Sequence, residues 1–257
     1  MAAVEIVDVT EGNVQSAGFF CAMSKPDSKG YQDKLEWLKA RFREGLKIKL
    51  IVRGGRGFIE YVPGEFAWRA IDAPRFMVIH CLWVVGRAKG RGSGAALLNE
   101  CVRDARSQGM DGVAAVTARH KVGLVDTGFF LHQGFRVVES APPGLDLVAL
   151  KFGRGPDPKF AGGWDEKLGA LGRGLTVFSS PQCPYAREGA ERVVSLARSM
   201  NIPARAVRLT RLDELRKRAP SAYGSFDVAC DGQVVANLYH LMTAQRLRKL
   251  LQGATRR

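Results

Sequence analysis

The residues of this chain with the clearest chemical meaning lie in one short segment, between Trp83 and Gly94. There an apolar stretch runs into a turn in which glycines alternate with cationic side chains, and an amphipathic stretch follows at once. Glycine permits positive φ angles and a close approach of the backbone, and the free N–H groups of a new helix attract anions. The segment therefore predicts a phosphate-binding loop, formed by Arg87, Lys89, Gly90, Arg91, Gly92, Ser93 and Gly94.

Two better-known phosphate loops do not match this segment. A P-loop requires Gly-Lys followed by Ser or Thr, whereas Lys89 precedes its glycine. A dinucleotide-binding fingerprint requires Gly-x-Gly-x-x-Gly, and Gly90, Gly92 and Gly94 are spaced differently. The sequence therefore excludes both of these nucleotide sites.

The loop instead reads Arg-x-x-Gly-x-Gly from Arg87 to Gly92, and in its context it resembles the acetyl-CoA loop of the GNAT superfamily of N-acetyltransferases. The predicted elements around it are, in order, a strand at 76–84, a helix to about residue 108, a strand at 112–117 and a helical segment at 129–135 that ends in Gly-Phe. The resemblance covers residues 4–152. It implies acetyl-CoA as the cosubstrate and a small-molecule or peptide amine as the acceptor.

The resemblance also implies how acetyl-CoA is held. The backbone of Leu82, Trp83 and Val84 is expected to pair with the pantetheine arm as an extra strand would. The family commonly places a tyrosine, the proton donor to the leaving thiolate, where this chain has Phe130, and an asparagine where it has Gly123. Phe130 is thus expected to line the cofactor site without donating a proton. Water could substitute, since a proton donor typically contributes 10²–10⁴-fold.

Three residues are candidates for the base that takes the proton of the amine. His80 titrates near neutrality and lies two residues before the segment that pairs with pantetheine. Glu60 lies on the preceding predicted hairpin, and His132 is a further candidate on the helix that carries Phe130. Cys81 is expected to face away from His80, because side chains alternate along a strand, and to fill the core.

A separate candidate is Cys183, in the sequence Cys-Pro-Tyr after a predicted strand. Its position at the opening of a helix, with Arg187 nearby, is expected to lower the pKa of the thiol and make it reactive. The position three residues on is Ala186, so no resolving thiol is available and only monothiol chemistry remains.

The composition limits the remaining classes of function. Five cysteines and four histidines show no metal-ligand spacing and no disulfide framework, so neither a metal nor disulfides are expected. No stretch is long and apolar enough to span a membrane, and the N-terminus lacks the pattern of a secretion signal, which together predict a cytoplasmic protein without a membrane partner. The sequence does not indicate an oligomeric state.

The net charge of +14 favours anionic partners. Residues 153–257 contribute +9 of it, from 18 Lys and Arg against nine Asp and Glu. Nucleic acid is one such partner, but few aromatic residues alternate with the cationic ones to stack bases. A basic module that binds RNA or an acidic protein therefore stays open only as an alternative.

The predicted elements around these residues divide the chain into 1–152, a linker at 153–173, and 174–257. The first part is expected to hold a strand at 4–9, a helix at 27–44, a hairpin of 47–52 with 57–62 and a strand at 65–71. Glycine and proline are too dense in the linker for regular structure, although Trp164, Leu168 and Leu171 suggest that it docks. The fold class is α/β, a mixed and mostly antiparallel sheet with flanking helices.

The last part begins again with a strand at 175–180 and Cys-Pro-Tyr, which resembles the glutaredoxin site. The elements expected after it are a helix to about residue 200, a strand at 204–209, a helix at 212–218, a hairpin at 226–235 and a helix at 243–251. This order is similar to a small thioredoxin-like α/β domain, and a GNAT domain with such a tail looks like the YoaP-type bacterial acetyltransferases.

The sequence thus predicts an N-acetyltransferase that moves the acetyl group of acetyl-CoA to a primary amine of unknown identity. Two alternatives stay open. One is a basic binding module with a vestigial CoA pocket, favoured by Phe130 at the tyrosine position, and the other is a monothiol redox protein that uses Cys183.

Overall fold

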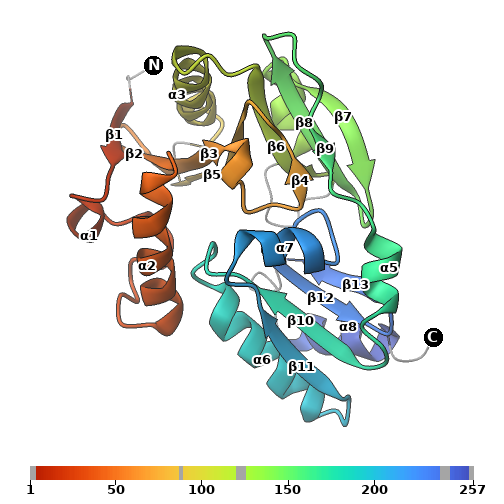
Figure 1. Ribbon diagram of the computed structural model, residues 1–257. Helices are drawn as coiled ribbons and strands as arrows, with labels where there is room; N and C mark the ends of the chain where they lie inside the picture. The colour runs from red at the N-terminus through yellow and green to blue at the C-terminus, as the bar shows by residue number, and fades with distance from the viewer. Residues whose placement is uncertain (1–3, 87–88, 120–125, 238–243, 255–257) are drawn as a thin grey trace.

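The computed structural model describes residues 4–86, 89–119, 126–237 and 244–254, which form two main sheets (Figure 1). A seven-stranded sheet has the order β1-β2-β3-β5-β6-β8-β7, and a four-stranded sheet has the order β11-β10-β12-β13. A third, two-stranded pair joins β4 to β9. No helix in the described part of the chain is long and apolar enough to cross a membrane.

The seven-stranded sheet is antiparallel except where β5 and β6 run parallel. Its strands are β1 (Glu5–Val9), β2 (Lys47–Arg53), β3 (Arg56–Pro63), β5 (Phe76–Val85), β6 (Gly112–Ala118), β7 (Arg136–Ala141) and β8 (Leu145–Lys151). The strands predicted at 4–9, 47–52, 57–62, 76–84 and 112–117 are confirmed. The predicted strand at 65–71 is wrong, because that segment begins with a short 3₁₀ helix (Gly64–Phe66) and only Ile71–Asp72 forms a strand, β4.

Helices cover both faces of this sheet. They are α1 (Val14–Ala17), α2 (Lys29–Arg43), α3 (Ser93–Ser107) and α4 (Thr127–His132). One core lies between the sheet and the side chains of α3 and α4, such as Leu97 and Phe130. The second core, on the other face, includes Trp37 and Leu38 of α2 and continues without a break into the four-stranded sheet.

The central strands β5 and β6 separate partway along their length. They pair from Phe76 with Gly112 to Ile79 with Ala115, and β5 then runs on to Val85 without a described partner on that side. A β-bulge begins at the same point, since Glu60 of β3 pairs with Cys81 and Tyr61 pairs with Ile79, which leaves His80 as the extra residue. A bulge bends a strand and redirects its side chains. The sheet therefore opens into a gap between β5 and β6.

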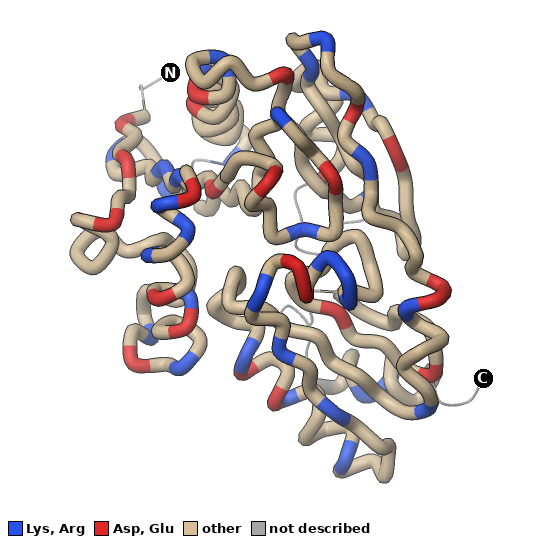
Figure 2. The backbone as a smooth tube through the Cα atoms, viewed as in Figure 1, with Lys and Arg blue, Asp and Glu red and all other residues tan. Residues whose placement is uncertain are grey.

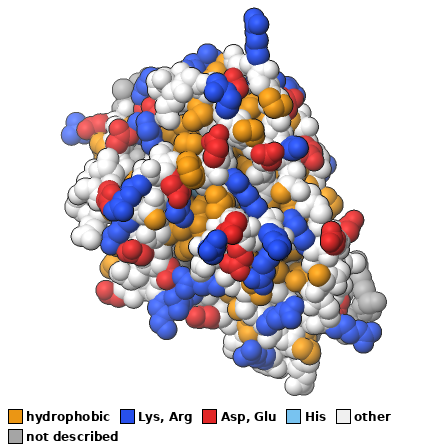
Figure 3. Space-filling model, in the orientation of Figure 1, with side chains coloured by type: hydrophobic (Ala, Val, Ile, Leu, Met, Phe, Trp, Pro, Cys, Tyr) orange, Lys and Arg blue, Asp and Glu red, His pale blue; other side chains and the backbone are white. Residues whose placement is uncertain are grey.

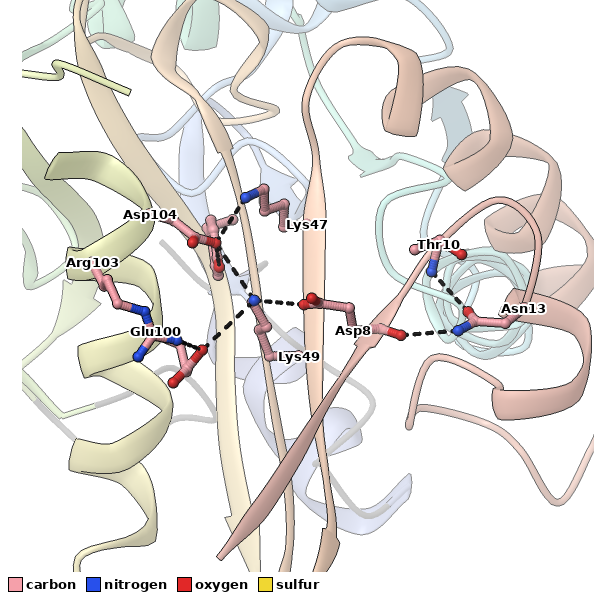
Figure 4. Close-up of polar contacts among 9 residues, drawn as sticks. Asp8, Thr10, Asn13, Lys47, Lys49, Glu100, Arg103 and Asp104 are labelled. Atoms are coloured by element: carbon pink, nitrogen blue, oxygen red, sulfur yellow. Dashed lines mark hydrogen bonds and ion pairs between the residues drawn. The ribbon is translucent and has the colours of Figure 1, made fainter. Parts of the chain in front are cut away.

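Ion pairs hold α3 against the edge of this sheet (Figure 4). The Lys49 ammonium, on a side chain only 9% exposed, lies 2.5 Å from a carboxylate oxygen of Asp8 and 3.6 and 3.7 Å from those of Glu100 and Asp104. The hydroxyl of Tyr61 also donates to Asp104, at 2.5 Å. Because Glu100 and Asp104 belong to α3, this network fixes the helix that follows the phosphate-binding loop.

The four-stranded sheet pairs β10 with β11 in parallel and with β12 antiparallel, and β12 forms a hairpin with β13. Its elements are β10 (Leu175–Ser179), α6 (Ala186–Arg198), β11 (Ala204–Arg208), α7 (Leu212–Arg218), β12 (Phe226–Cys230), β13 (Gln233–Asn237) and α8 (Ala244–Ala254). Each element predicted for this part of the sequence is present. The predicted start of the last helix, Thr243, lies outside the described residues.

The segment 153–173 differs from the prediction of a linker without regular structure. It contains β9 (Lys159–Phe160), which pairs with β4, and α5 (Trp164–Gly169). The backbone N–H of Phe160 donates to Glu139 at 2.6 Å, and Trp164 packs against the core. Glycine and proline shorten these elements without preventing them, because the segment finds partners on the larger sheet.

Direct contacts join the two main sheets into one body. Asp33 of α2 forms ion pairs with Arg187 at 3.0 Å and with Arg208 at 2.6 Å. The N–H of Gly30 donates to Glu188 of α6 at 2.9 Å, and Arg216 of α7 donates to backbone carbonyls near the 3₁₀ helix. Lysine and arginine are otherwise scattered over both parts and interspersed with acids (Figure 2).

Candidate active site

In the phosphate loop, residues 87–94, the described part from Lys89 onward has the backbone geometry that its glycines predict. Gly90 and Gly92 have φ angles of 76° and 83°, and α3 begins directly afterwards at Ser93. The first N–H of α3 to find a helical acceptor is that of Ala96, and those of residues 90–95 have no acceptor among the described residues, which leaves them for an anion. Arg87 lies outside the described residues. The loop therefore fits a phosphate group through its backbone.

Next to this loop lies a cavity of about 580 Å³, which we call the acceptor chamber. Its walls come from both main sheets, and the residues that the argument uses are Cys21, Lys34, Arg56, Glu60, Arg69, His80, Cys81, Leu82, Trp83, Ala115, Phe130, Gln182, Cys183, Tyr185 and Tyr223. Figure 3 shows apolar side chains gathered between the two sheets, with charged side chains around them. This volume suits a small ligand.

The predicted pantetheine and thioester residues lie where β5 and β6 separate. Leu82 and Trp83 line the chamber, as do Ala115 of β6 and Phe130 of α4, whereas Val84 does not, although it lies between two lining residues of β5. Beyond Ile79 one edge of β5 has no described strand partner, so its backbone groups can pair with an extended ligand. Phe130 is buried and offers no proton, as the sequence predicts.

A cluster of buried polar side chains forms the deep wall of the chamber. The Lys34 ammonium lies 2.5 Å from Oε2 of Glu60, and Oε1 of Glu60 lies 3.1 Å from Nδ1 of His80. Gln182 donates from Nε2 to the same Oε1 at 3.0 Å. All four side chains are at most 5% exposed. Glu60 and His80, which the sequence offers as separate candidates for the base, thus lie in contact, and Lys34 and Gln182 were missed.

The bonds of His80 leave no free ring nitrogen. Its Nε2 accepts the backbone N–H of Trp68 at 2.9 Å, so Nδ1 carries the proton and donates to Glu60. Burial, together with the neighbouring cations, lowers the pKa of His80 to about 4. His80 is therefore neutral, and it has no lone pair for the proton of an acceptor amine.

Glu60 is an anion that keeps some capacity to accept hydrogen bonds. Burial alone would raise its pKa, but the Lys34 cation and the His80 hydrogen bond outweigh burial and hold the pKa at about 2. A carboxylate offers about four lone-pair sites, and Glu60 uses one on Oε2 and two on Oε1. One further N–H can therefore bind at Oε2.

Three thiols meet in the chamber, from Cys21, Cys81 and Cys183. The expectation that Cys81 faces away from His80 is wrong, because the bulge at His80 breaks the alternation of the strand and both residues line the chamber. Burial raises the pKa of all three thiols, that of Cys81 to about 12.

The expected activation of Cys183 is also wrong. Its pKa is raised by burial, although a backbone N–H bond at Tyr185 opposes the rise, and α6 begins only at Ala186. Arg187 pairs with Asp33 of the other sheet. Cys183 is therefore a protonated thiol of the chamber wall. His132 is exposed on α4 and does not line the chamber.

Arg69 was missed by the sequence prediction, although it is the most deeply buried arginine of the chamber. Its side chain is 1% exposed and lies over the ring of Tyr223, with 5.0 Å between the guanidinium carbon and the ring centroid. Nη1 donates to the carbonyl of Trp68 and to Oε1 of Gln182, and Nη2 donates to the carbonyl of His80. Gln182 thus links Arg69 to Glu60.

One sequence signal could have found part of this cluster. Lys34 falls inside the apolar stripe of the predicted helix at 27–44, three residues after Tyr31 and four before Leu38. A lysine in such a stripe is buried only with a partner. Arg69 and Gln182 carry no comparable signal, because each is positioned by a loop of irregular structure.

Two comparisons of sequence agree with this geometry. A model of the acetyltransferase (GNAT) family matches residues 8–135, and a curated relative is 33% identical over 249 residues. The chain therefore belongs to the GNAT family of acetyltransferases and is an acetyl-CoA-dependent acyltransferase. The relative is the uncharacterized N-acetyltransferase YoaP of Bacillus subtilis (strain 168), and the match covers 95% of this chain and 97% of YoaP.

Two further matches cover about half of the chain. The L-methionine sulfoximine/L-methionine sulfone acetyltransferase of Pseudomonas paraeruginosa is 30% identical over 124 residues, which is 48% of this chain and 68% of that protein. A solved structure of PaiA N-acetyltransferase from Thermoplasma acidophilum in complex with coenzyme A is 15% identical and covers 59% of this chain and all of that chain, with a TM-score of 0.42.

Proposed function

We propose that this protein transfers the acetyl group of acetyl-CoA to the nitrogen of a primary amine bound in the acceptor chamber. The observation that carries the proposal is that the phosphate loop and the acceptor chamber both adjoin strand β5. A loop of free N–H groups suited to a diphosphate stands at one end of β5, and the gap between β5 and β6 leads from it to the chamber. Acetyl-CoA supplies the activated acyl group, as a thioester.

The residues that would hold acetyl-CoA are those of the phosphate loop and of the free edge of β5. The N–H groups from Gly90 to Gly94 would bind the diphosphate, whereas that of Lys89 donates to the carbonyl of Gly86, and the side chains of Arg87, Lys89 and Arg91 would add charge. The backbone of Leu82, Trp83 and Val84 would pair with the pantetheine arm, with Phe130 packed beside its end.

For the amine, we assign the orienting role to Glu60. Its free acceptor site on Oε2 can take one N–H of the amine, which directs the nitrogen lone pair toward the thioester carbonyl. The new C–N bond forms as the C–S bond breaks, the thiolate leaves with a proton, and the amine loses one to solvent. A pKa of about 2 makes Glu60 a weak base, so we propose orientation rather than proton transfer, and His80 supports it by its bond to Oε1.

We further propose that residues 174–257 form a thioredoxin-like domain that shapes the acceptor end. The order β11-β10-β12-β13, with a parallel β10–β11 pair joined through α6, supports this assignment. Gln182, Cys183, Tyr185 and Tyr223 bring this domain into the chamber wall. The domain would therefore govern which amine fits.

The proposal is tested by incubating the protein with acetyl-CoA and a panel of primary amines. We expect release of free CoA thiol only when an accepted amine is present, with an equal amount of N-acetylated amine by mass spectrometry. Binding of CoA without acetylation of any amine, or thiol release without an acetylated product, would overturn it.

A further inference from the structure

One cation of the acceptor chamber has no anionic partner. Arg69 is buried, yet the acceptors of its hydrogen bonds are two backbone carbonyls and one amide oxygen, all of them uncharged. Its Nε–H, which is also buried, has no hydrogen-bond partner in the described structure. Burying an arginine without a counter-ion is costly, and such a group is rarely retained without a reason.

No acid of the chain neutralises Arg69 by direct contact. The segments that the structure does not describe contain no aspartate or glutamate, and no ion pair of Arg69 occurs in the described ones. Glu60 is paired with Lys34 at 2.5 Å. Asp227 lies within electrostatic reach of Arg69, but its Oδ1 accepts from Ser221 and Asn237.

The charge of the chamber as a whole also favours a ligand with an anionic group. Among the described residues that line it, the cations are Lys34, Arg56 and Arg69, and the only anion is Glu60. His80 stays neutral at physiological pH because burial lowers its pKa to about 4. A polycationic amine would be repelled by such a wall, whereas an amine that also carries an anionic group would be attracted.

Arg69 and Glu60 lie only one side-chain amide apart in the chamber wall. Gln182 bridges them with a single amide, accepting from Nη1 of Arg69 at 3.3 Å and donating to Oε1 of Glu60 at 3.0 Å. Among the described residues Nη2 donates to one acceptor, the carbonyl of His80, and Nε to none, so one N–H on each of these nitrogens is available. Two N–H groups on one edge of a guanidinium bind a carboxylate in a bidentate manner.

We propose that the acceptor is a small amine that also carries a carboxylate, an α-amino acid or a close analogue, with its carboxylate on Arg69 and its amine on Glu60. This inference rests on the proposed acetyl transfer and names the substrate class of that same chamber. The apolar remainder of the acceptor lies against the aromatic side chains of the wall, such as Phe19, Phe58 and Tyr185.

The first experiment uses matched amines that differ only in the carboxylate. Protein saturated with CoA is titrated calorimetrically with L-phenylalanine against 2-phenylethylamine, L-leucine against 3-methylbutylamine, and L-methionine against 3-(methylthio)propylamine. We expect the amino acid to bind roughly 10- to 100-fold more tightly in at least one pair, the usual effect of a hydrogen bond to a charged group. Equal or tighter binding of the decarboxylated amine, or no binding in any pair, would overturn the inference.

The same pairs with acetyl-CoA in place of CoA separate this inference from the proposed function. Preferential binding of the amino acid without any acetylated product would contradict acetyl transfer but support the carboxylate site. Acetylation of the decarboxylated amines at equal or higher kcat/KM would support acetyl transfer and contradict the carboxylate site.

Two arginine variants locate the carboxylate. Arg69→Lys keeps the positive charge but loses the paired N–H groups of the guanidinium. We expect it to reduce the preference for the amino acid at least tenfold, and thermal unfolding is measured in parallel. Arg56→Gln removes the exposed arginine at the chamber and is expected to leave the preference intact. If the folded Arg69→Lys protein still prefers the amino acid, or if Arg56→Gln loses that preference, the assignment of the carboxylate to Arg69 is contradicted. If Arg69→Lys does not fold, the binding of the matched amines to the unchanged protein tests the carboxylate site.

Discussion

The two ends of the site, the phosphate loop and the acceptor chamber, are formed by different chemical groups. The phosphate loop is exposed from Lys89 to Gly92, and we propose that it binds mainly through backbone N–H groups. The acceptor chamber is built from buried side chains of α2, β3, β5 and the loop before α6, which hold each other by charge and hydrogen bonds. A change at the first end should therefore alter ligand binding alone, whereas a change at the second should alter binding and folding together.

The largest effect is expected from Glu60→Gln in the chamber. Removing one partner of a buried ion pair leaves Lys34 uncompensated and typically costs about 3–5 kcal/mol of stability. The melting temperature and kcat should both fall, while the Kd for CoA, measured by calorimetry, should stay unchanged. In the double variant with Lys34→Met we expect stability to return and activity to stay low; recovery of activity as well would show that Glu60 has no role beyond folding.

At the other end, Gly92→Asp should abolish most CoA binding and leave folding nearly intact. An Asp side chain places a negative charge where the diphosphate binds, and we expect roughly a 100-fold rise in Kd. Gly109→Asp is the matched control, since its φ of 64° is also positive and neither position has atoms near an added Cβ. If both variants weaken CoA equally, the loop is not the phosphate site.

Gly30→Ala tests the contact between the two sheets. In a helix interior, alanine is ordinarily about 0.5–1 kcal/mol more stable than glycine. Here an added Cβ would overlap the carbonyl oxygen of Pro184 and press on Glu188, so we expect destabilisation of about 1–3 kcal/mol and weaker binding of the amine. Gly253→Ala in α8, where a Cβ meets nothing, should be neutral or stabilising. A stabilised Gly30→Ala protein would contradict close docking of α2 against this loop.

The smallest net effect concerns pH, because two buried groups oppose each other. Burial lowers the pKa of His80 to about 4. As the pH falls from about 6.5 to 4, the unfolded chain therefore binds more protons than the native state, and up to about 3 kcal/mol of stability is lost. The pKa of Asp227 is raised by burial to about 6, so between about pH 6 and 4 the native state binds more protons and a similar amount of stability is gained.

Single variants should separate these two contributions. Denaturant unfolding at pH 7 and pH 4.5 should give a His80→Gln protein that becomes more stable at the lower pH, and an Asp227→Asn protein that becomes less stable there, each relative to the unchanged chain. Identical pH profiles for all three proteins would mean that neither group is held in an abnormal protonation state.

The same difference between the two ends explains what the sequence could predict. The phosphate loop is local, so the spacing of Gly90 and Gly92 was enough to predict their positive φ angles and the helix that follows, whereas phosphate binding there stays a prediction. The strands of the smaller sheet were likewise predicted, although β11, with two arginines among its five residues, has no apolar run. The chamber depends on contacts between residues more than a hundred positions apart, such as Glu60 with Gln182, and no local pattern encodes them.

Two errors have a common physical origin. Strict alternation placed Cys81 and His80 on opposite faces, but one extra residue in β5 turned both into the chamber. The helix position suggested an activated Cys183, but packing against the larger sheet buried the thiol and raised its pKa instead. In both cases tertiary contacts outweighed a rule that holds for an isolated strand or helix.

The central claim is that the gap between β5 and β6 carries the reactive end of acetyl-CoA from the phosphate loop into a chamber shared by both sheets. A crystal structure of the complex with CoA tests it directly. We predict the diphosphate on the N–H groups of residues 90–94, the pantetheine arm along β5 beyond Ile79, and the sulfur facing the wall that contains Glu60 and Gln182. A sulfur that ends outside this chamber, or a diphosphate bound away from the loop, would contradict the account.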